Sequence, residues 1–192
     1  MTSKHTPTSF FRCGLALVIT CIVTAASSLY AQKGPTENEV KSAYLYNFGK
    51  FVEWPPKATS VGEVFTVCVL GDDTFGATLE TTIAGESIEG KKVLVKRVAK
   101  PQDAVSCRIL FIGSSQQGRV KEILAELDNT SVLTVSDMPE FTRRGGMIQF
   151  VVEANRVRFE VNLTSAERSG LTLSSQLLKV AVNVKRSTQP GG

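Results

Sequence analysis

Apolar residues along the chain recur at two spacings, which predict alternating helices and strands. Residues 37–54 carry Tyr44, Phe48 and Phe51 at three- to four-residue spacing, as on one helix face, and Pro55 ends this helix. The same two patterns predict helices at 74–83 and 116–127, and strands at 64–70, 92–98, 107–112 and 131–135. Apolar strands that alternate with helices indicate a largely parallel sheet that is covered on both faces.

The last third of the chain predicts a hairpin followed by a helix. Strands at 147–153 and 156–162 alternate between apolar and polar residues and meet at Ala154-Asn155. One face of this hairpin carries the apolar residues Ile148, Phe150, Val152, Val157, Phe159 and Val161. The other face is expected to lie in solvent and carries Met147, Gln149, Val151, Arg158 and Glu160. With a last helix at 174–186, the predicted fold is a single three-layer α/β/α domain whose sheet is mixed and largely parallel.

The first thirty-one residues have the pattern of an export signal. Lys4 and Arg12 form a basic leader, and the apolar run that follows, 13–26, is shorter than the ~20 residues that a membrane-spanning helix needs. Ala31 offers a cleavage point, so we divide the chain into a signal peptide, 1–31, and one domain, 32–192. An anchor that stays uncleaved is the alternative.

Composition describes an ordinary globular protein and argues against nucleic acid as a partner. Hydrophobic residues make up 42% of the chain and charged residues 21%, and the formal net charge is only +4. The densest basic stretch lies around Lys91, Lys92, Lys96 and Arg97 and is broken by Glu89 nearby, as on a solvated surface.

The cysteine and histidine content limits which disulfides, catalytic residues and metal ligands the exported chain can have. Once Cys13 and Cys21 are assigned to the signal, Cys68 and Cys107 remain, and two cysteines in an oxidising compartment favour one disulfide over two separate buried thiols. The single histidine, His5, also lies in the signal. Catalysis that uses histidine and metal sites that use histidine are therefore excluded for the exported chain. We predict no catalytic residue, no cofactor and no metal site.

Polar residues at two strand ends offer an alternative ligand site. Asp72 and Asp73 follow the strand at 64–70, and Ser114 follows the strand at 107–112, at the edge where open α/β sheets bind ligands. A magnesium site of the kind found in receiver domains would also need a third acid and a lysine, which this second strand end lacks. The competing interpretation is a turn in which an aspartate caps the next helix.

The first helix is unusually aromatic. Five aromatic residues fall within eleven positions, 44–54, and one helix face cannot bury them all. We therefore expect Tyr46 or Trp54 to line a groove or an interface.

Several segments, in order along the chain, resemble the YfiR-like family of exported bacterial regulators. The family's opening signature resembles YLYNFGKFVEWP at 44–55, and its closing one resembles SGLTLSSQLLKVA at 169–181. Between them lie VCVLGDDTFG at 67–76, CRILFIGSS at 107–115, VLTVSD at 132–137, GGMIQF at 145–150 and RVRFEVN at 156–162.

This resemblance implies a periplasmic repressor that binds the periplasmic part of an inner-membrane diguanylate cyclase and so restrains cyclic-di-GMP synthesis and biofilm formation. It also implies that an outer-membrane lipoprotein sequesters the repressor and that thiol oxidation affects its folding and control. The family's cysteine pair corresponds to Cys68 and Cys107. Some members carry a second pair near the C-terminal hairpin, where this chain has no cysteine between residues 142 and 152.

Two classes of function follow. A regulatory binding protein, which is not an enzyme, would use the mixed face of the hairpin, and Gln149, Val151, Arg158 and Glu160 are its candidate contact residues. A second copy of the chain is a further candidate partner. The alternative is a periplasmic small-ligand binding or sensor domain that uses Asp72, Asp73 and Ser114. A contiguous exposed apolar surface would favour the first class and a deep polar pocket the second.

Overall fold

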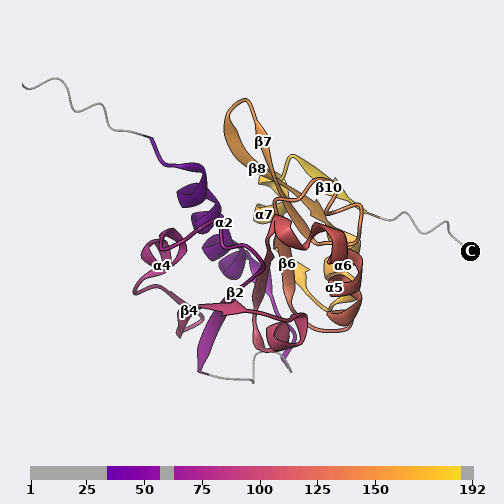
Figure 1. Cartoon of the computed structure of the whole chain (residues 1–192), viewed down its shortest axis with the longest axis horizontal. Coiled ribbons are helices and arrows are strands. Elements are labelled where there is room, and N and C mark those ends of the chain that lie inside the picture. Colours follow the sequence, from indigo (N-terminus) through magenta and orange to yellow (C-terminus); the bar gives the residue numbers. More distant parts are fainter. Residues whose placement is uncertain (1–33, 57–62, 187–192) are drawn as a thin grey trace, which may run out of the picture. The chain divides into compact units, whose positions relative to one another are not determined.

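A curled eight-stranded sheet forms the centre of the fold. The computed structural model describes residues 34–56 and 63–186, so the predicted signal lies outside the described residues. The chain divides into two units after Gly34, and the fold is that of the second, Pro35–Gly192. The strand order is β10-β8-β7-β6-β5-β2-β4-β3, and five of its seven pairings are parallel. Figure 1 shows the sheet and the helices around it.

Strands and helices alternate along much of the chain. The strands of the sheet are β2 (Val64–Leu70), β3 (Ser87–Ile88), β4 (Lys91–Val98), β5 (Ile109–Ile112), β6 (Leu133–Ser136), β7 (Ile148–Glu153), β8 (Arg156–Asn162) and β10 (Asn183–Lys185). The helices are α2 (Glu37–Phe51), α4 (Thr78–Ile83), α5 (Val120–Glu126), α6 (Leu163–Arg168) and α7 (Ser175–Val180), with 3₁₀ turns η2 (Pro101–Ser106) and η3 (Ser114–Arg119). A separate pair of short strands, β1 (Val52–Glu53) and β9 (Thr172–Leu173), runs antiparallel.

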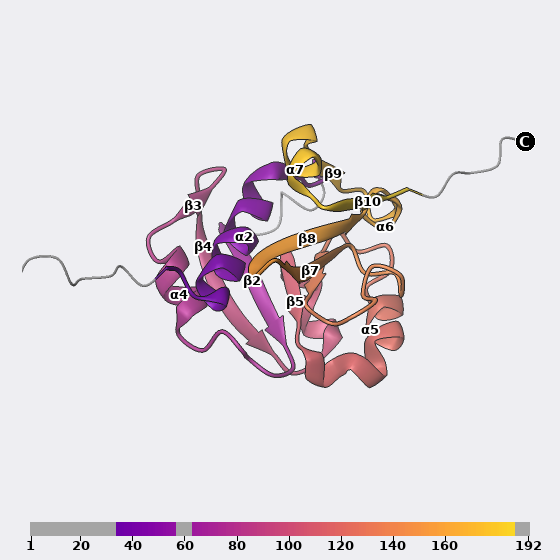
Figure 2. The same cartoon turned by 90° about the horizontal axis from the view of Figure 1, so that it is seen from above.

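Helices cover both faces of the sheet, as the sequence predicts, and each face has its own core. Helices α2 and α4 lie on one face and α5 lies on the other (Figure 2). Alternate residues of β5 divide between the two cores: Ile109 and Phe111 pack toward α2, whereas Leu110 and Ile112 pack toward α5. The domain is therefore a three-layer α/β/α sandwich.

Helix α2 starts at a strong capping signal and ends earlier than predicted. Thr36 accepts a hydrogen bond from the Glu39 amide, and the Glu39 carboxylate accepts one from the Thr36 amide, a reciprocal capping box. The predicted end at residue 54 is wrong, because the chain turns extended at Val52 and pairs with Leu173. Two central helices are also shorter than predicted: α4 begins at Thr78, and the stretch 116–127 starts as the 3₁₀ turn η3.

The C-terminal segment is a helix followed by a strand, and the predicted helix over 174–186 is wrong beyond Val180. Ser174 caps α7 by accepting a hydrogen bond from the Leu177 amide. The chain then becomes extended and adds β10 to the sheet, where Val184 pairs with Val161 of β8. No helix in the described part of the chain is long and apolar enough to cross a membrane.

The β7–β8 hairpin has the predicted strands and register, but two of its residues differ from the predicted burial. Met147, expected in solvent, is only 6% exposed, whereas Val152, expected in the core, is 57% exposed. Ile148 and Phe150 on the same face as Val152 are buried. The alternation itself is correct, and Val152 is exposed because the hairpin extends beyond the helices that cover its base (Figure 1).

The hairpin turn carries backbone strain that a substitution can test. Ala154 and Asn155 both have positive φ, at 47° and 59°, as a two-residue type I′ turn requires, and alanine is disfavoured there by its Cβ. We expect Ala154→Gly to raise the free energy of unfolding by about 1 kcal/mol, as measured by chemical denaturation. Asn155→Ala is the matched control and should lower it, because it adds the same strain at the second position.

Candidate partner-binding site

The hairpin brings the four predicted contact residues onto one face of the sheet. Gln149 pairs with Glu160 across the two strands, and Val151 pairs with Arg158, so the four side chains form two adjacent rows. Val151 and Glu160 are half-buried and Arg158 is exposed. The outer end of this hairpin face therefore presents an aliphatic side chain beside a cation, a mixture found at protein–protein interfaces.

Gln149 does not belong to the solvent-exposed surface that the sequence predicts. It is 8% exposed, because the loop that connects β6 to β7 folds over the base of the hairpin. The amide of Thr142 in this loop donates a hydrogen bond to Gln149 Oε1 at 3.3 Å, and Asn162 Nδ2 donates one to the Thr142 carbonyl at 2.9 Å. Gln149 therefore helps to hold the loop in place and presents little exposed surface of its own.

Glu160 occupies the border between this loop and a hollow beside it. Its carboxylate accepts a hydrogen bond from Thr142 Oγ1 at 3.4 Å. A hollow of about 620 Å³ lies next to it, lined by Gln149 and Glu160 together with Glu140, Arg143, Lys185 and Arg186, among others. Lys185 comes from β10 and Arg186 follows it directly, in a stretch for which the sequence predicts a helix. The alternating Val182, Val184 and intervening polar residues were the signal for a strand there.

A second, apolar groove lies between α2 and α7. Aromatic rings from α2 (Tyr44, Phe48 and Phe51) and Phe159 from β8 line a space of about 300 Å³, together with Leu177 and Val180 of α7. The rings pack on one another: Tyr44 and Phe48 stack at 5.9 Å between centroids, and Phe48 meets Phe159 edge to face at 5.1 Å.

The prediction that Tyr46 or Trp54 lines a groove or an interface is wrong for Trp54. Trp54 is buried against Phe65, with the two ring centroids 5.3 Å apart. Tyr46 is half-buried, and its hydroxyl donates a hydrogen bond to the Glu86 carboxylate at 2.6 Å, which raises the pKa of Tyr46. The aromatic residues that line the apolar groove are instead Tyr44, Phe48 and Phe51 of α2 and Phe159 of β8.

Two of the strand-end residues of the alternative ligand site, Asp72 and Asp73, form hydrogen bonds and an ion pair with neighbouring residues of the protein. Asp73 Oδ1 accepts hydrogen bonds from the amides of Phe75 and Gly76, and its other oxygen forms an ion pair with Arg97. The Asp72 amide donates to Ser115 Oγ at 2.9 Å, so the two strand-end loops are in contact. A Cβ at Gly113 would lie 2.6 Å from the Asp72 carbonyl oxygen, which explains the glycine. Ser114 is exposed, and among the described residues no hydrogen bond joins it to Asp72 or Asp73.

A buried lysine, which the sequence analysis missed, lies at the carboxyl end of β6. Lys41 of α2 is 5% exposed, and its Nζ lies 2.7 Å from Asp137 and 2.7 Å from Glu37. Burial lowers the pKa of Lys41, but the hydrogen bonds to Asp137 and Glu37 outweigh it, and the pKa is raised overall. A lysine among the apolar positions of a predicted core helix was the available signal.

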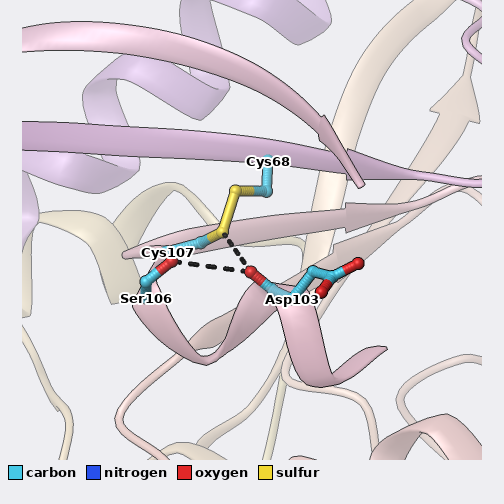
Figure 3. Close-up of a disulfide and its surroundings, with 4 residues drawn as sticks. All are labelled: Cys68, Asp103, Ser106 and Cys107. Atoms are coloured by element: carbon cyan, nitrogen blue, oxygen red, sulfur yellow. Dashed lines mark hydrogen bonds between the residues drawn. A yellow bond between two sulfur atoms is a disulfide. The ribbon is translucent and has the colours of Figure 1, made fainter. Parts of the chain in front are cut away.

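Cys68 and Cys107 form a disulfide in the core on the α5 side of the sheet. Their Cα atoms are 6.0 Å apart, and both residues are buried. Cys68 lies in the middle of β2, and Cys107 lies just after η2, at the entry to β5 (Figure 3). The Asp103 carbonyl oxygen lies 4.0 Å from Cys107 Sγ, a contact without a proton because the sulfur is in the disulfide. The bond therefore ties β2 to the chain segment that enters its neighbouring strand, β5.

Within residues 34–56 and 63–186, no three His, Cys, Asp or Glu side chains are grouped in a way that could hold a metal ion.

The structure defines a three-layer α/β domain with one core disulfide and a projecting hairpin of mixed polarity. Comparison with protein families gives the class a name. Residues 38–182 match the YfiR/HmsC-like family, and the chain belongs to that family. Its proteins are periplasmic regulators and not enzymes, and membership supports a regulator of diguanylate cyclase at the level of the family.

One solved structure resembles this chain in fold. A conserved domain protein from Vibrio cholerae superimposes with a TM-score of 0.53 at 11% identity, over 75% of this chain and 60% of that one. The ABC domain from Streptococcus pneumonia, described in complex with L-Trp, gives a TM-score of 0.46 at 13% identity, over 64% of this chain and 55% of that one. The chain thus spans about three fifths of the Vibrio protein, and that likeness shows the fold alone.

Proposed function

We propose that this protein is a periplasmic repressor that binds the periplasmic domain of an inner-membrane diguanylate cyclase and so lowers cyclic-di-GMP synthesis and biofilm formation. The observation that carries the proposal is the outer hairpin face, where Val151, Arg158 and Glu160 form a continuous surface of mixed polarity. Membership of the YfiR/HmsC-like family supports the class of partner.

Repression by binding requires a difference in affinity between two states of the cyclase. A ligand shifts an equilibrium only as far as it prefers one state over the other, so the hairpin face must fit the inactive form of the periplasmic domain better than the active form. An outer-membrane lipoprotein that competes for the repressor would reverse the effect by mass action. Export by the signal at 1–31 would deliver the protein to the compartment where both partners are accessible.

The small-ligand alternative has less support from the geometry. Asp73 is engaged by Arg97 and by two backbone amides, and Ser114 takes part in no hydrogen bond with Asp72 or Asp73. The largest hollow described above lies instead beside Glu160, on the hairpin side of the molecule. This polar space adjoins the proposed partner surface and can receive a side chain of the partner.

Charge reversal at the exposed cation of the hairpin tests the proposal. We expect Arg158→Glu to weaken binding to the purified periplasmic domain of the host's diguanylate cyclase at least tenfold in isothermal titration calorimetry, because the exposed guanidinium is replaced by a repelling carboxylate. The melting temperature should stay within about 2 °C, since surface substitutions change stability by about 0.5 kcal/mol or less.

Lys92→Glu, on the exposed part of β4 across the sheet, is the matched control and should bind like the unmodified protein. In cells, Arg158→Glu should raise cyclic-di-GMP, while Lys92→Glu should not. Equal loss of affinity in both variants would point to general charge attraction, and unchanged binding of Arg158→Glu would remove the hairpin face from the proposal.

A further inference from the structure

A hollow of about 250 Å³ lies on the α5 side of the sheet, between α5, α6 and the loop that connects β6 to β7. Its floor is formed by two buried residues, Thr134 of β6 and Met147, which directly precedes β7. Residues at i, i+3 and i+4 share one face of a helix, and two such sets border the hollow: Lys121, Leu124 and Ala125 of α5, and Ser165, Arg168 and Ser169 in and just after α6. The two helices therefore turn polar and basic faces toward the same space.

The hollow has an excess of positive charge. Its lining contains the cations Lys121, Arg144 and Arg168 and a single carboxylate, that of Asp128, which is a formal excess of two positive charges. Among the residues that the structure describes, none of these four side chains forms an ion pair. Three cations that border one hollow without carboxylate partners raise the local concentration of anions. The charge of the lining therefore favours a ligand with two negative charges.

Hydroxyl groups in the lining have hydrogen-bond donors that the protein leaves unused. Thr134 is 1% exposed, and its Oγ1 accepts a hydrogen bond from the Met147 amide at 3.2 Å. A hydroxyl can also donate one hydrogen bond, and in the described part of the chain the Thr134 hydroxyl donates to no acceptor. Ser165 and Ser169 are half-buried, and only their main-chain groups take part in the hydrogen bonds described. A buried donor without an acceptor is unfavourable, so the floor of the hollow is complementary to an acceptor oxygen.

Arg144 is held in place by the loop that carries it. It is half-buried, and its Nη1 donates a hydrogen bond to the Gln117 carbonyl at 3.3 Å. The Gly146 amide donates to the Phe141 carbonyl at 2.9 Å, so the loop turns back on itself at this point. Gly145 in between has a φ of 109°, a conformation that glycine adopts without steric cost. The loop thus presents a guanidinium to the hollow, and most of its N–H donors remain available to a ligand.

We propose that this hollow binds the phosphate group of a small, soluble organic phosphate. A phosphate monoester carries a charge of about −1.5 to −2 at pH 7 and has three acceptor oxygens, which match the excess charge and the unused hydroxyl donors. Arginine binds phosphate through paired hydrogen bonds, a role for Arg144 and Arg168. Leu124 and Met147 provide apolar contact for a short organic part. The volume lies below the ~300–1,000 Å³ of pockets for drug-sized ligands, so the organic part is small.

Isothermal titration calorimetry of the purified protein with glycerol phosphate tests the site without any protein partner, so its outcome is independent of the proposed function. At low ionic strength we expect one site with a Kd of about 0.1 mM. Succinate, a dianion without a phosphate group, and inorganic phosphate, which lacks an organic part, should each bind at least about fivefold more weakly. Equal binding of either one, or a Kd above about 1 mM for glycerol phosphate, would overturn the assignment.

Substitutions in the lining separate this site from general attraction of anions. Arg168→Gln should weaken the binding of glycerol phosphate at least about tenfold, because it removes an exposed guanidinium that borders the hollow. Arg156→Gln makes the same charge change at the tip of the β7–β8 hairpin, outside the lining, and should bind within about twofold of the unmodified protein. Asp128→Asn removes the carboxylate of the lining and should strengthen binding about threefold, a gain that loss of folding cannot produce. Equal weakening by the two arginine substitutions, or no gain in Asp128→Asn, would contradict the site.

Vesicles distinguish a soluble ligand from a lipid headgroup that carries the same phosphate group. We expect the unmodified protein not to sediment with vesicles of phosphatidic acid and phosphatidylcholine. Sedimentation that Arg168→Gln abolishes would assign the hollow to a lipid and overturn the proposal of a small, soluble ligand.

Discussion

Replacing Cys68 or Cys107 by alanine is expected to lower the free energy of unfolding by about 4 kcal/mol. The bond joins residues 39 positions apart, and a loop of about 40 residues gives this value in the chain-entropy model. For a domain of about 160 residues, the loss corresponds to a fall in melting temperature of roughly 8–16 °C. Thermal unfolding followed by circular dichroism, with and without reductant, measures it directly.

The double variant separates the bond from the packing of its two sulfur atoms. Both single substitutions break the same bond, so Cys68→Ala with Cys107→Ala should be little less stable than either one. The unmodified protein under reducing conditions should approach the stability of these variants. Destabilisation that adds fully in the double variant would show that packing of the two side chains, and not the cross-link, carries the effect.

Removal of Asp137 is expected to have the second largest effect, a loss of about 3 kcal/mol in Asp137→Ala. Lys41 Nζ is buried and would keep only Glu37, whose side chain is largely exposed. Leaving a buried charge without its partner costs about 3–5 kcal/mol, and the remaining carboxylate keeps the value at the lower end. Chemical denaturation at pH 7 gives the measurement.

Lys41→Met is the informative control, because it removes the charge itself. The carboxylates that Lys41→Met leaves without a partner, on Asp137 and Glu37, are 23% and 55% exposed and can be solvated, so this variant should lose less stability than Asp137→Ala, which leaves a buried ammonium. Combined with Asp137→Ala, it should recover much of the stability that Asp137→Ala loses. The raised pKa of Lys41 fixes the pH dependence: the stabilisation is fully present below about pH 10 and is lost as the pH rises through the folded-state value. The difference between Asp137→Ala and the unmodified chain should therefore be constant from pH 6 to 9.

The parts of the fold that the sequence predicts well are those in which local pattern and tertiary contact agree. Strands β2 and β8 have the predicted bounds, since each is a run of β-branched residues ended by a turn. The final helix was overextended because helix capping at Ser174 is visible locally, whereas the pairing of Val184 with Val161 is not. A strand as short as β10 forms because it pairs with β8, and that pairing is not visible in its own sequence.

In the candidate site, too, local sequence pattern predicts one part and tertiary contacts decide the rest. Alternation along the hairpin placed Gln149, Val151, Arg158 and Glu160 on one face, which the register bears out. Which of them reach solvent depends on the loop that carries Thr142, and that loop has no periodic pattern from which its path could be read. Lys41 was missed for a related reason, because its carboxylate partner Asp137 is 96 positions away along the chain.

The bonds that fasten the Thr142 loop over the hairpin have a consequence for how the chain can respond to oxidants. The loop is held by the Gln149 and Asn162 side chains, whose amide groups neither gain nor lose electrons under envelope conditions. Thiol chemistry after residue 31 is confined to Cys68 and Cys107, on the α5 side of the sheet. A reductant would thus change how many molecules stay folded and leave the hairpin of each folded molecule as it was. Redox conditions would therefore set the amount of folded protein.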